Sequence, residues 1–405
     1  MFTMSISMET AYGSLTLFTS ILHNVFLLYH IDIFVSVYKI DKTSFWFGET
    51  LFLIWNSLND PIFGWISDKK LLGIVSNNSS VTNIVWSRLG ALQLYGPLFS
   101  CAFVLFWVHW AWPGLQFAVC LCLYDGFLTM IDLHHSALLA DLSLSDSVRT
   151  KLNSRCSLFS AIGSISVFLS YLVWNKIDLT TFRIFCFVLA TISFIGYLKM
   201  VKVLKKAYIK YSKDSQVQID LQEQSVTDSF SGQESKASIL KFGRQLLSHR
   251  NFVWFAFLNL VQYCNRVFTE GTCKLLNLVI SDLVDEDVVL HSRPQAVSAL
   301  VFGTAALVSK PGQTLAPVIG TWILALQTGH DIFQSGNEDG SIKLDLSKMD
   351  SAVRLAYKQG VFMMLICVPV VCAILQLLAW SQYTLKGQRL AQIKSFRAKL
   401  HHIPV

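Results

Sequence analysis

Residues 114–140, GLQFAVCLCLYDGFLTMIDLHHSALLA, form one long apolar run that nevertheless contains Asp125 and Asp132. A helix needs about 20 mostly apolar residues to cross a membrane, and this run exceeds that length. Carboxylates at membrane depth are costly to bury and are by default functional. The run therefore predicts a membrane protein that holds a polar centre inside the bilayer.

The composition of the whole chain agrees with this prediction. Of its 405 residues, 53% are hydrophobic and 15% are charged, whereas soluble domains carry roughly 25% charged residues. The net charge of +7 comes from Lys and Arg beside apolar runs, not from a separate basic domain, which argues against nucleic-acid binding. We expect an all-α polytopic membrane protein surrounded by membrane lipid.

Apolar runs divide the chain into two sets of spans. Six candidate spans form an N-terminal bundle within residues 1–204, at 12–38, 44–66, 88–110, 114–140, 155–174 and 180–203. A polar stretch, residues 205–250, follows as a flexible, partly helical linker. Three apolar stretches at 252–281, 295–326 and 359–382 then predict a shortened C-terminal bundle within residues 251–382, followed by a basic tail, residues 383–405.

The distribution of Lys and Arg predicts the orientation, because these residues are retained on the cytoplasmic side. They gather in alternate loops of the first bundle and in the linker, so the N-terminus and the linker are predicted to be cytoplasmic. The basic tail should lie there too, yet three further crossings would place it outside. A break at about Asn265, which divides residues 252–281 into two pieces, would remove this conflict.

Two patterns accompany this organisation. Residues 277–308 weakly echo residues 136–168, each with an Asp at a helix end, a charged turn and then a helix of small residues. Duplicated halves are typical of transporters. The tail alternates apolar and basic residues at helical spacing, which fits either a helix lying on an anionic leaflet or a solvated helix.

The most informative motif is NSLNDPIFGWISDKK, residues 56–70, at the inner end of the second span. Pro61 is expected to bend the helix, and Gly64 permits a close approach of another backbone. Asp68 falls at the inner surface, where charge pairs can lock or release neighbouring helices. A kinked helix with ordinary flanking charges is the alternative, but Asp60, a carboxylate within the span, favours a functional interpretation.

Other ionisable residues also lie at membrane depth. Lys310 requires a carboxylate partner or the loss of its proton, and Asp60 and Asp132 are both candidate partners. For the histidines, hydrogen bonding inside the bundle is the simpler interpretation. The complete set outside the motif comprises His23, Asp125, Asp132, His134, His135 and Lys310.

A second polar group lies in the C-terminal part. Arg266, Glu270 and Lys274 recur every four residues and share one helix face, so they either neutralise one another or line a polar pathway. No Cys/His cluster has the spacing of metal ligands, so we expect no metal site and no cofactor. Without a nucleophile elbow or a phosphate loop, an intramembrane enzyme is not expected.

These motifs resemble the major facilitator superfamily, in particular its glycoside-pentoside-hexuronide:cation symporter branch, typified by the melibiose carriers. The resemblance rests on NDPIFGWISD, on TMIDLHHSALLADLSLSD, on YHIDIFVSVY and on Lys310-Pro311-Gly312. NRVFTEGTCKLLNLVISDLVDEDVVL and LVSKPGQTLAPVIGTWIL are particularly similar to the major facilitator superfamily domain-containing 13 proteins, also called the transmembrane protein 180 family.

The resemblance implies two six-helix bundles around a central cavity, alternating access, and a sugar-like solute that moves with H+ or Na+. It implies a cation-binding carboxylate at Asp60, a sugar-binding carboxylate at Asp132 and a buried lysine at Lys310. Thr16 and Asn56 stand where the branch has further carboxylates, which shifts the expected coupling from sodium toward a proton or no ion. Relative to this branch, the second bundle lacks about three spans.

The sequence thus predicts a major facilitator fold with a shortened C-terminal bundle and a solute:cation symporter. Asp60, Asp132, Lys310 and Asn56 are its expected binding residues. The alternative is a non-transporting membrane scaffold, or a truncated isoform of such a carrier. Nothing in the sequence distinguishes the plasma membrane from an intracellular membrane.

Overall fold

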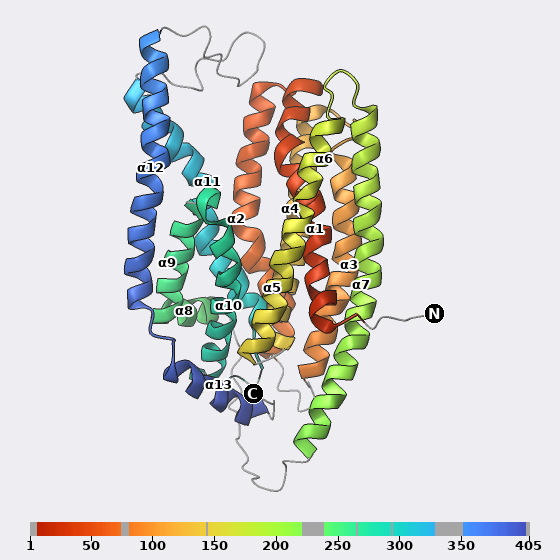
Figure 1. Ribbon diagram of the computed structural model, residues 1–405, viewed down its shortest axis with the longest axis vertical. Helices are drawn as coiled ribbons and strands as arrows, with labels where there is room; N and C mark the ends of the chain where they lie inside the picture. The colour runs from red at the N-terminus through yellow and green to blue at the C-terminus, as the bar shows by residue number, and fades with distance from the viewer. Residues whose placement is uncertain are drawn as a thin grey trace.

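The computed structural model consists of helices that run mostly side by side (Figure 1). It describes residues 6–73, 81–142, 145–220, 239–264, 266–291, 293, 295–328 and 351–401. In chain order the elements are α1 (Met8–Asp32), the π-helical turn η1 (Ile33–Val37), α2 (Lys42–Gly73), α3 (Val81–Leu105), α4 (Pro113–Leu142), α5 (Asp146–Gly163), α6 (Ile165–Val173), α7 (Thr180–Asp220), α8 (Ile239–Leu247), α9 (Arg250–Cys264), α10 (Arg266–Leu290), α11 (Ser298–Thr328), α12 (Ser351–Gln382) and α13 (Gln388–His401).

Most of these helices have the length and composition of membrane spans. Within the described residues, six stretches qualify, namely Met8–Val37, Asn83–Leu105, Pro113–Leu142, Asp146–Val173, Thr180–Tyr211 and Arg354–Gln382. α2 and α11, with 32 and 31 residues, also exceed the roughly 20 residues that a span requires. The predicted all-α polytopic fold is confirmed.

The first bundle, α1–α7, is the better packed of the two. α1 packs against α5 and α7, α3 packs against α4 and α7, and α2 packs against α4. Aromatic rings fill its centre, where Phe26 stacks on Tyr124 with ring centroids 4.0 Å apart and Phe106 meets both rings. Because lipid is as apolar as these side chains, close packing is what holds such helices together.

The helix boundaries differ most from the predicted ones at three places. The fifth span begins at Asp146, not at residue 155, and consists of α5 and α6, which meet at Ser164. α7 continues to Asp220, far past the predicted start of the linker at residue 205, and α12 begins at Ser351 instead of residue 359. In each case charged or polar residues continue a helix beyond the apolar run that the sequence reveals.

α9 and α10 form an antiparallel hairpin at the predicted break. α9 ends at Cys264 and α10 begins at Arg266, while the Asn251 side chain at the start of α9 donates to Glu286 near the end of α10 at 2.9 Å. With 15 residues, α9 is about 22 Å long and does not cross the roughly 30 Å hydrocarbon core. The hairpin therefore returns the chain toward the end at which α9 begins.

The second bundle is sparse. α11 packs against α9 and α12, but it packs as extensively against α2 of the first bundle. α12 stands at the edge of the molecule (Figure 1) and has only α9 and α11 as principal neighbours. Its side chains Phe362, Leu365 and Leu377 are exposed, so α12 meets lipid around most of its circumference.

Candidate substrate and cation site

Two glycines bring α2 and α11 into direct backbone contact. A Cβ atom on Gly64 would lie 2.8 Å from the Ala299 carbonyl oxygen, and one on Gly303 would lie 2.5 Å from the Asp60 carbonyl oxygen. Only glycine fits at such a crossing, because a side chain at either position would hold the two backbones apart. α2 remains one helix through Pro61, so the crossing places the middle of α2 against the first turns of α11.

An ion pair between the two bundles lies beside this crossing. The Nζ atom of Lys310, on α11, pairs with the Oδ2 atom of Asp60, on α2. Asp60 is only 6% exposed, and Lys310 is half-buried. Of the two partners considered for Lys310, the structure supplies Asp60.

Two asparagines of α2 surround the same ammonium group. Lys310 donates to the Oδ1 atom of Asn56 at 2.8 Å and to the Oδ1 atom of Asn59 at 3.4 Å. The Nδ2 group of Asn59 turns the other way and donates to Asp125 and to the hydroxyl of Thr129, the latter at 3.1 Å. Asn59 thus bridges Lys310 of the second bundle to α4 of the first.

Asn59 and Thr129 were not predicted as site residues. Both are neutral, so they cost little to place in a span and carry no charge signal. Their spacing was the available signal, since Asn59 precedes Asp60 directly and Thr129 lies three residues, almost one helical turn, before Asp132.

Asp132 belongs to the same face of α4 as Asp125. Seven residues separate them, which corresponds to two helical turns and about 10 Å along the axis. Asp132 is exposed, and its charge is felt by the buried phenols of Tyr124 and Tyr197. The Asp60–Lys310 pair and Asp132 therefore lie at different depths of the bundle.

The three histidines predicted at membrane depth make contacts inside the first bundle. His135 stacks on Tyr12 with centroids 4.1 Å apart, and Nδ1 of His23 lies 3.2 Å from the Tyr124 hydroxyl. His134 is buried beside Tyr95. Arg266, Glu270 and Lys274 fall on α10, but their side chains lie outside the described residues.

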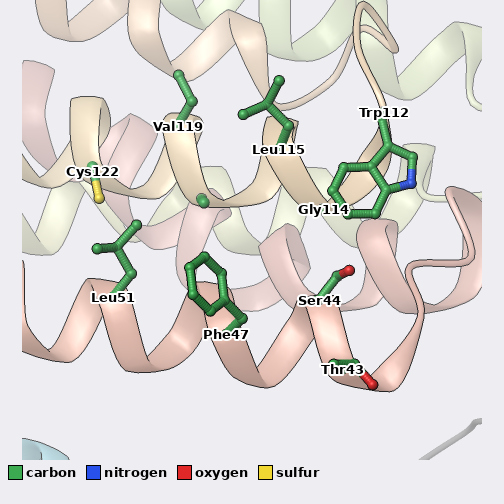
Figure 2. Close-up of a pocket in the computed structure, with 10 residues that line it drawn as sticks. Thr43, Ser44, Phe47, Leu51, Trp112, Gly114, Leu115, Val119 and Cys122 are labelled. Atoms are coloured by element: carbon green, nitrogen blue, oxygen red, sulfur yellow. The ribbon is translucent and has the colours of Figure 1, made fainter.

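An apolar groove of about 580 Å³ opens between the outer ends of α2 and α4, on the side away from the linker (Figure 2). Phe47 and Leu51 extend from α2 toward α4, and Trp112 covers the outer end. The inner end lies at Cys122, which is one helical turn before Asp125. The groove thus leads from the outer side toward the polar centre.

On the linker side, a buried charge cluster closes the contact between α11 and the first bundle. Arg88 of α3 pairs with Asp68 at 2.8 Å and with Asp141 at 3.3 Å. The α11 N-terminus completes the cluster, because the Leu300 N–H donates to Asp68 at 2.8 Å and the Ser298 hydroxyl donates to Asp141 at 2.5 Å. The cluster thus contains two carboxylates and one cation, Arg88. The positive end of the α11 dipole stabilises the additional negative charge.

A second linker-side cluster joins α5, α10 and the tail helix α13. Arg149 of α5 holds Asp285 of α10 with two hydrogen bonds, at 2.7 and 3.1 Å. Arg397 of α13 pairs with the same Asp285, and Lys394 pairs with Asp282 at 2.8 Å and also with Asp146, at the start of α5. The tail helix is therefore anchored to both bundles.

Asp68 was predicted to form charge pairs that lock neighbouring helices, and its partner is Arg88 of α3. Arg88, Arg149 and the tail cations were not predicted as members of a cluster, because in the sequence they resemble the Lys and Arg that flank apolar runs. The internal echo contained a signal for two of them, because its two copies align Asp141 of α4 with Asp282 of α10. Both of these aspartates proved to be members of the charge clusters.

Comparisons with known proteins agree with this architecture. The family model described as MFS/sugar transport protein matches residues 11–277. The chain is 44% identical to transmembrane protein 180 of Gallus gallus over 484 residues, covering 96% of this chain and 94% of that protein. It is 43% identical to transmembrane protein 180 of Mus musculus over 501 residues, covering 99% and 96%.

The alignments are longer than this chain. An alignment of 484 positions takes in 96% of a chain of only 405 residues, so the relative contains positions with no counterpart here. They are enough for about three spans with their connections, at roughly 20 residues or more per span. With the fold, the family match and these identities together, the chain belongs to the major facilitator superfamily and, within it, to the transmembrane protein 180 family.

Proposed function

We propose that this protein is a secondary carrier that moves a small polar, sugar-like solute together with a cation by alternating access. Asp60, Asn56, Asn59 and Lys310 form the centre of its binding site, and Asp132 supplies a further carboxylate for the solute. The proposed orientation places the N-terminus, the linker and the tail in the cytoplasm, in accordance with the distribution of Lys and Arg.

The observation that carries the proposal is the Asp60–Lys310 ion pair. It joins the two bundles at membrane depth, where a purely structural contact could be made from apolar side chains without the cost of desolvating two charges. Because its two members belong to different bundles, any rocking of one bundle against the other must separate or rearrange them.

The two ends of the bundle interface support the same proposal. The linker side is closed by Arg88 and Arg149 with their carboxylates, whereas the groove lies open on the outer side. A carrier needs one closed end and one open end in each of its two states. Exchange between these states would require the linker-side ion pairs to part.

Uptake by the full chain in proteoliposomes tests the proposal. A panel of labelled sugars and polyols should contain a solute whose uptake depends on a pH or sodium gradient, and Asp60→Ala should abolish that uptake. Asp178→Ala, which changes an exposed carboxylate in the outer loop before α7, is the matched control and should transport normally. Unchanged gradient-driven uptake in Asp60→Ala would refute the assignment.

The sparse second bundle favours one alternative, a non-transporting scaffold or shortened form of a carrier. A bundle without about three spans encloses less of a pathway, and the exposed apolar face of α12 could then bind another membrane protein. A protein of this kind would give no solute uptake, while removal of α12 side chains such as Phe362 would change its association with other chains.

A further inference from the structure

Asp125 gives the polar centre a carboxylate that no described cation neutralises. It lies half-buried on α4 and accepts a hydrogen bond from the Nδ2 group of Asn59. Among the described side chains, no Lys, Arg or His lies within ion-pair distance of it. The ammonium group of Lys310, the cation of this centre, is already engaged by Asp60 and by the Oδ1 atoms of Asn56 and Asn59.

The charges of the centre therefore do not balance. Asp60 and Lys310 cancel, since each brings one unit charge, and Asp125 would add an unpaired negative charge at membrane depth. A carboxylate in such surroundings takes up a proton or binds a cation, because the ionised form is poorly solvated there. Asn56 is neutral and changes nothing in this count.

The orientation of Asn59 favours a proton over a metal cation. Sodium, like other hard cations, requires several oxygen ligands converging on one point. The amide oxygens of Asn56 and Asn59 face Lys310, and Asn59 presents its N–H groups to Asp125 and Thr129. Donor hydrogens beside Asp125 repel a metal ion, whereas a proton needs only the remaining carboxylate oxygen.

The groups that surround Asp125 come from three helices. α2 brings Asp60 and Asn59, and α11 brings Lys310. Its own helix brings the Cys122 thiol and the Tyr124 phenol, both of which lie close enough to feel its charge. Cys122 also lines the inner end of the apolar groove, which gives the carboxyl group a route toward the outer side.

We propose that Asp125 is the residue that binds and releases the coupling proton, an assignment that rests on the proposed carrier function. While Lys310 pairs with Asp60, Asp125 is the neutral acid. When movement of the bundles or arrival of solute parts that pair, Lys310 turns along Asn59 toward Asp125. The O–H bond of the acid then breaks, the proton passes to water, and the carboxylate keeps the electron pair and faces the ammonium group.

Infrared spectroscopy of the full chain in nanodiscs, titrated with pH, tests this assignment without requiring a known solute. The wild type should show a carbonyl band of a protonated carboxylic acid that disappears as the pH rises. Asp125→Asn should lack this band. Asp132→Asn, which removes the other α4 carboxylate on the same face, is the matched control and should retain it.

A second variant tests the assignment even if Asp125→Asn folds poorly. Asp60→Asn releases Lys310 to pair with Asp125, so the midpoint of the band should move to lower pH by about one unit or more. A band that persists in Asp125→Asn, or a midpoint that Asp60→Asn leaves unchanged, would overturn the assignment.

Uptake measurements separate this assignment from the proposed function. If proton-driven uptake persists in Asp125→Asn, the proton assignment is wrong and the carrier function stands. If the band behaves as predicted but no solute is taken up under any gradient, Asp125 is the proton-binding group and the carrier function is wrong.

Discussion

Asp60 on α2 and Lys310 on α11 form an ion pair that connects the two bundles inside the membrane, beside the glycine crossing of the same two helices. Among the described residues, the other ion pairs and the hydrogen bonds that join the bundles through Asp68, Asp141, Arg149 and Asp146 lie near the linker side. The pair is therefore the polar link closest to the middle of the interface, and the site is organised around it.

Removing only one member of this pair should be more harmful than removing both. Lys310→Met leaves Asp60 buried without its cation and should destabilise the protein by about 3–5 kcal/mol, because an uncompensated buried charge is costly. The Asp60→Asn/Lys310→Met double variant should recover much of that loss. Unfolding of the purified variants in detergent measures both effects, and equal stabilities of the single and double variants would show that the pair is not coupled.

The glycine crossing predicts a selective intolerance of even one methyl group. Gly64→Ala and Gly303→Ala force Cβ atoms against backbone atoms of the opposite helix and should each cost about 1–3 kcal/mol. Gly90→Ala, where nothing lies within 4 Å, is the matched control and should be neutral or slightly stabilising. Thermal unfolding of the three variants provides the comparison, and a control as unstable as the other two would refute the explanation.

The tail helix should depend on its two buried cations. Arg397→Ala removes a cation that pairs with Asp285, so α13 should detach from the end of α10. We expect faster proteolysis of the tail and faster hydrogen exchange at the end of α10. Ser395→Ala, on the exposed side of the same helix, should change neither. Equal protection in the wild type and Arg397→Ala would mean that other contacts hold the tail.

The local stability of the end of α10, which lies outside the membrane-spanning segments, should depend on pH. A hydrogen bond to Asp287 raises the pKa of His291 above its ordinary value of 6.5. A group whose pKa is higher in the folded than in the unfolded protein stabilises the fold at pH values below its pKa in the unfolded protein. This contribution is lost as the pH rises through its pKa in the folded protein. Local opening measured by hydrogen exchange, corrected for intrinsic rates, should be rarer at about pH 6 than at about pH 8. His291→Gln should remove that difference.

Much of the fold follows from the sequence because lipid imposes a simple rule on composition. Each apolar run became a helix, and the conflict between charge distribution and crossing number located the break between α9 and α10. The extension of α7 to Asp220 was not predicted, since a helix that leaves the membrane loses the apolar signal that marks it. The break at Ser164 was missed because residues 156–173, on both sides of it, form one continuous run without charged residues.

The sequence predicts only those site residues that place a charge inside an apolar run. Asp60 and Lys310 stand out because a span rarely contains ionised residues. Asn59 and Thr129 carry no charge, and their role follows from which helices cross, which the sequence does not state. In the sequence, Arg397 resembles any cation that flanks an apolar run, and only the structure shows that it pairs with Asp285.

The central claim is that the Asp60–Lys310 centre binds a solute, and solute-dependent stability measures this most directly. Ligand that binds only the folded state raises the apparent unfolding temperature. Across a panel of sugars, polyols and cations, we predict that at least one solute raises the unfolding temperature of the wild type and fails to do so in a folded Asp60→Asn variant. A panel without any stabilising solute, or a stabilisation that persists undiminished in Asp60→Asn, would contradict the claim.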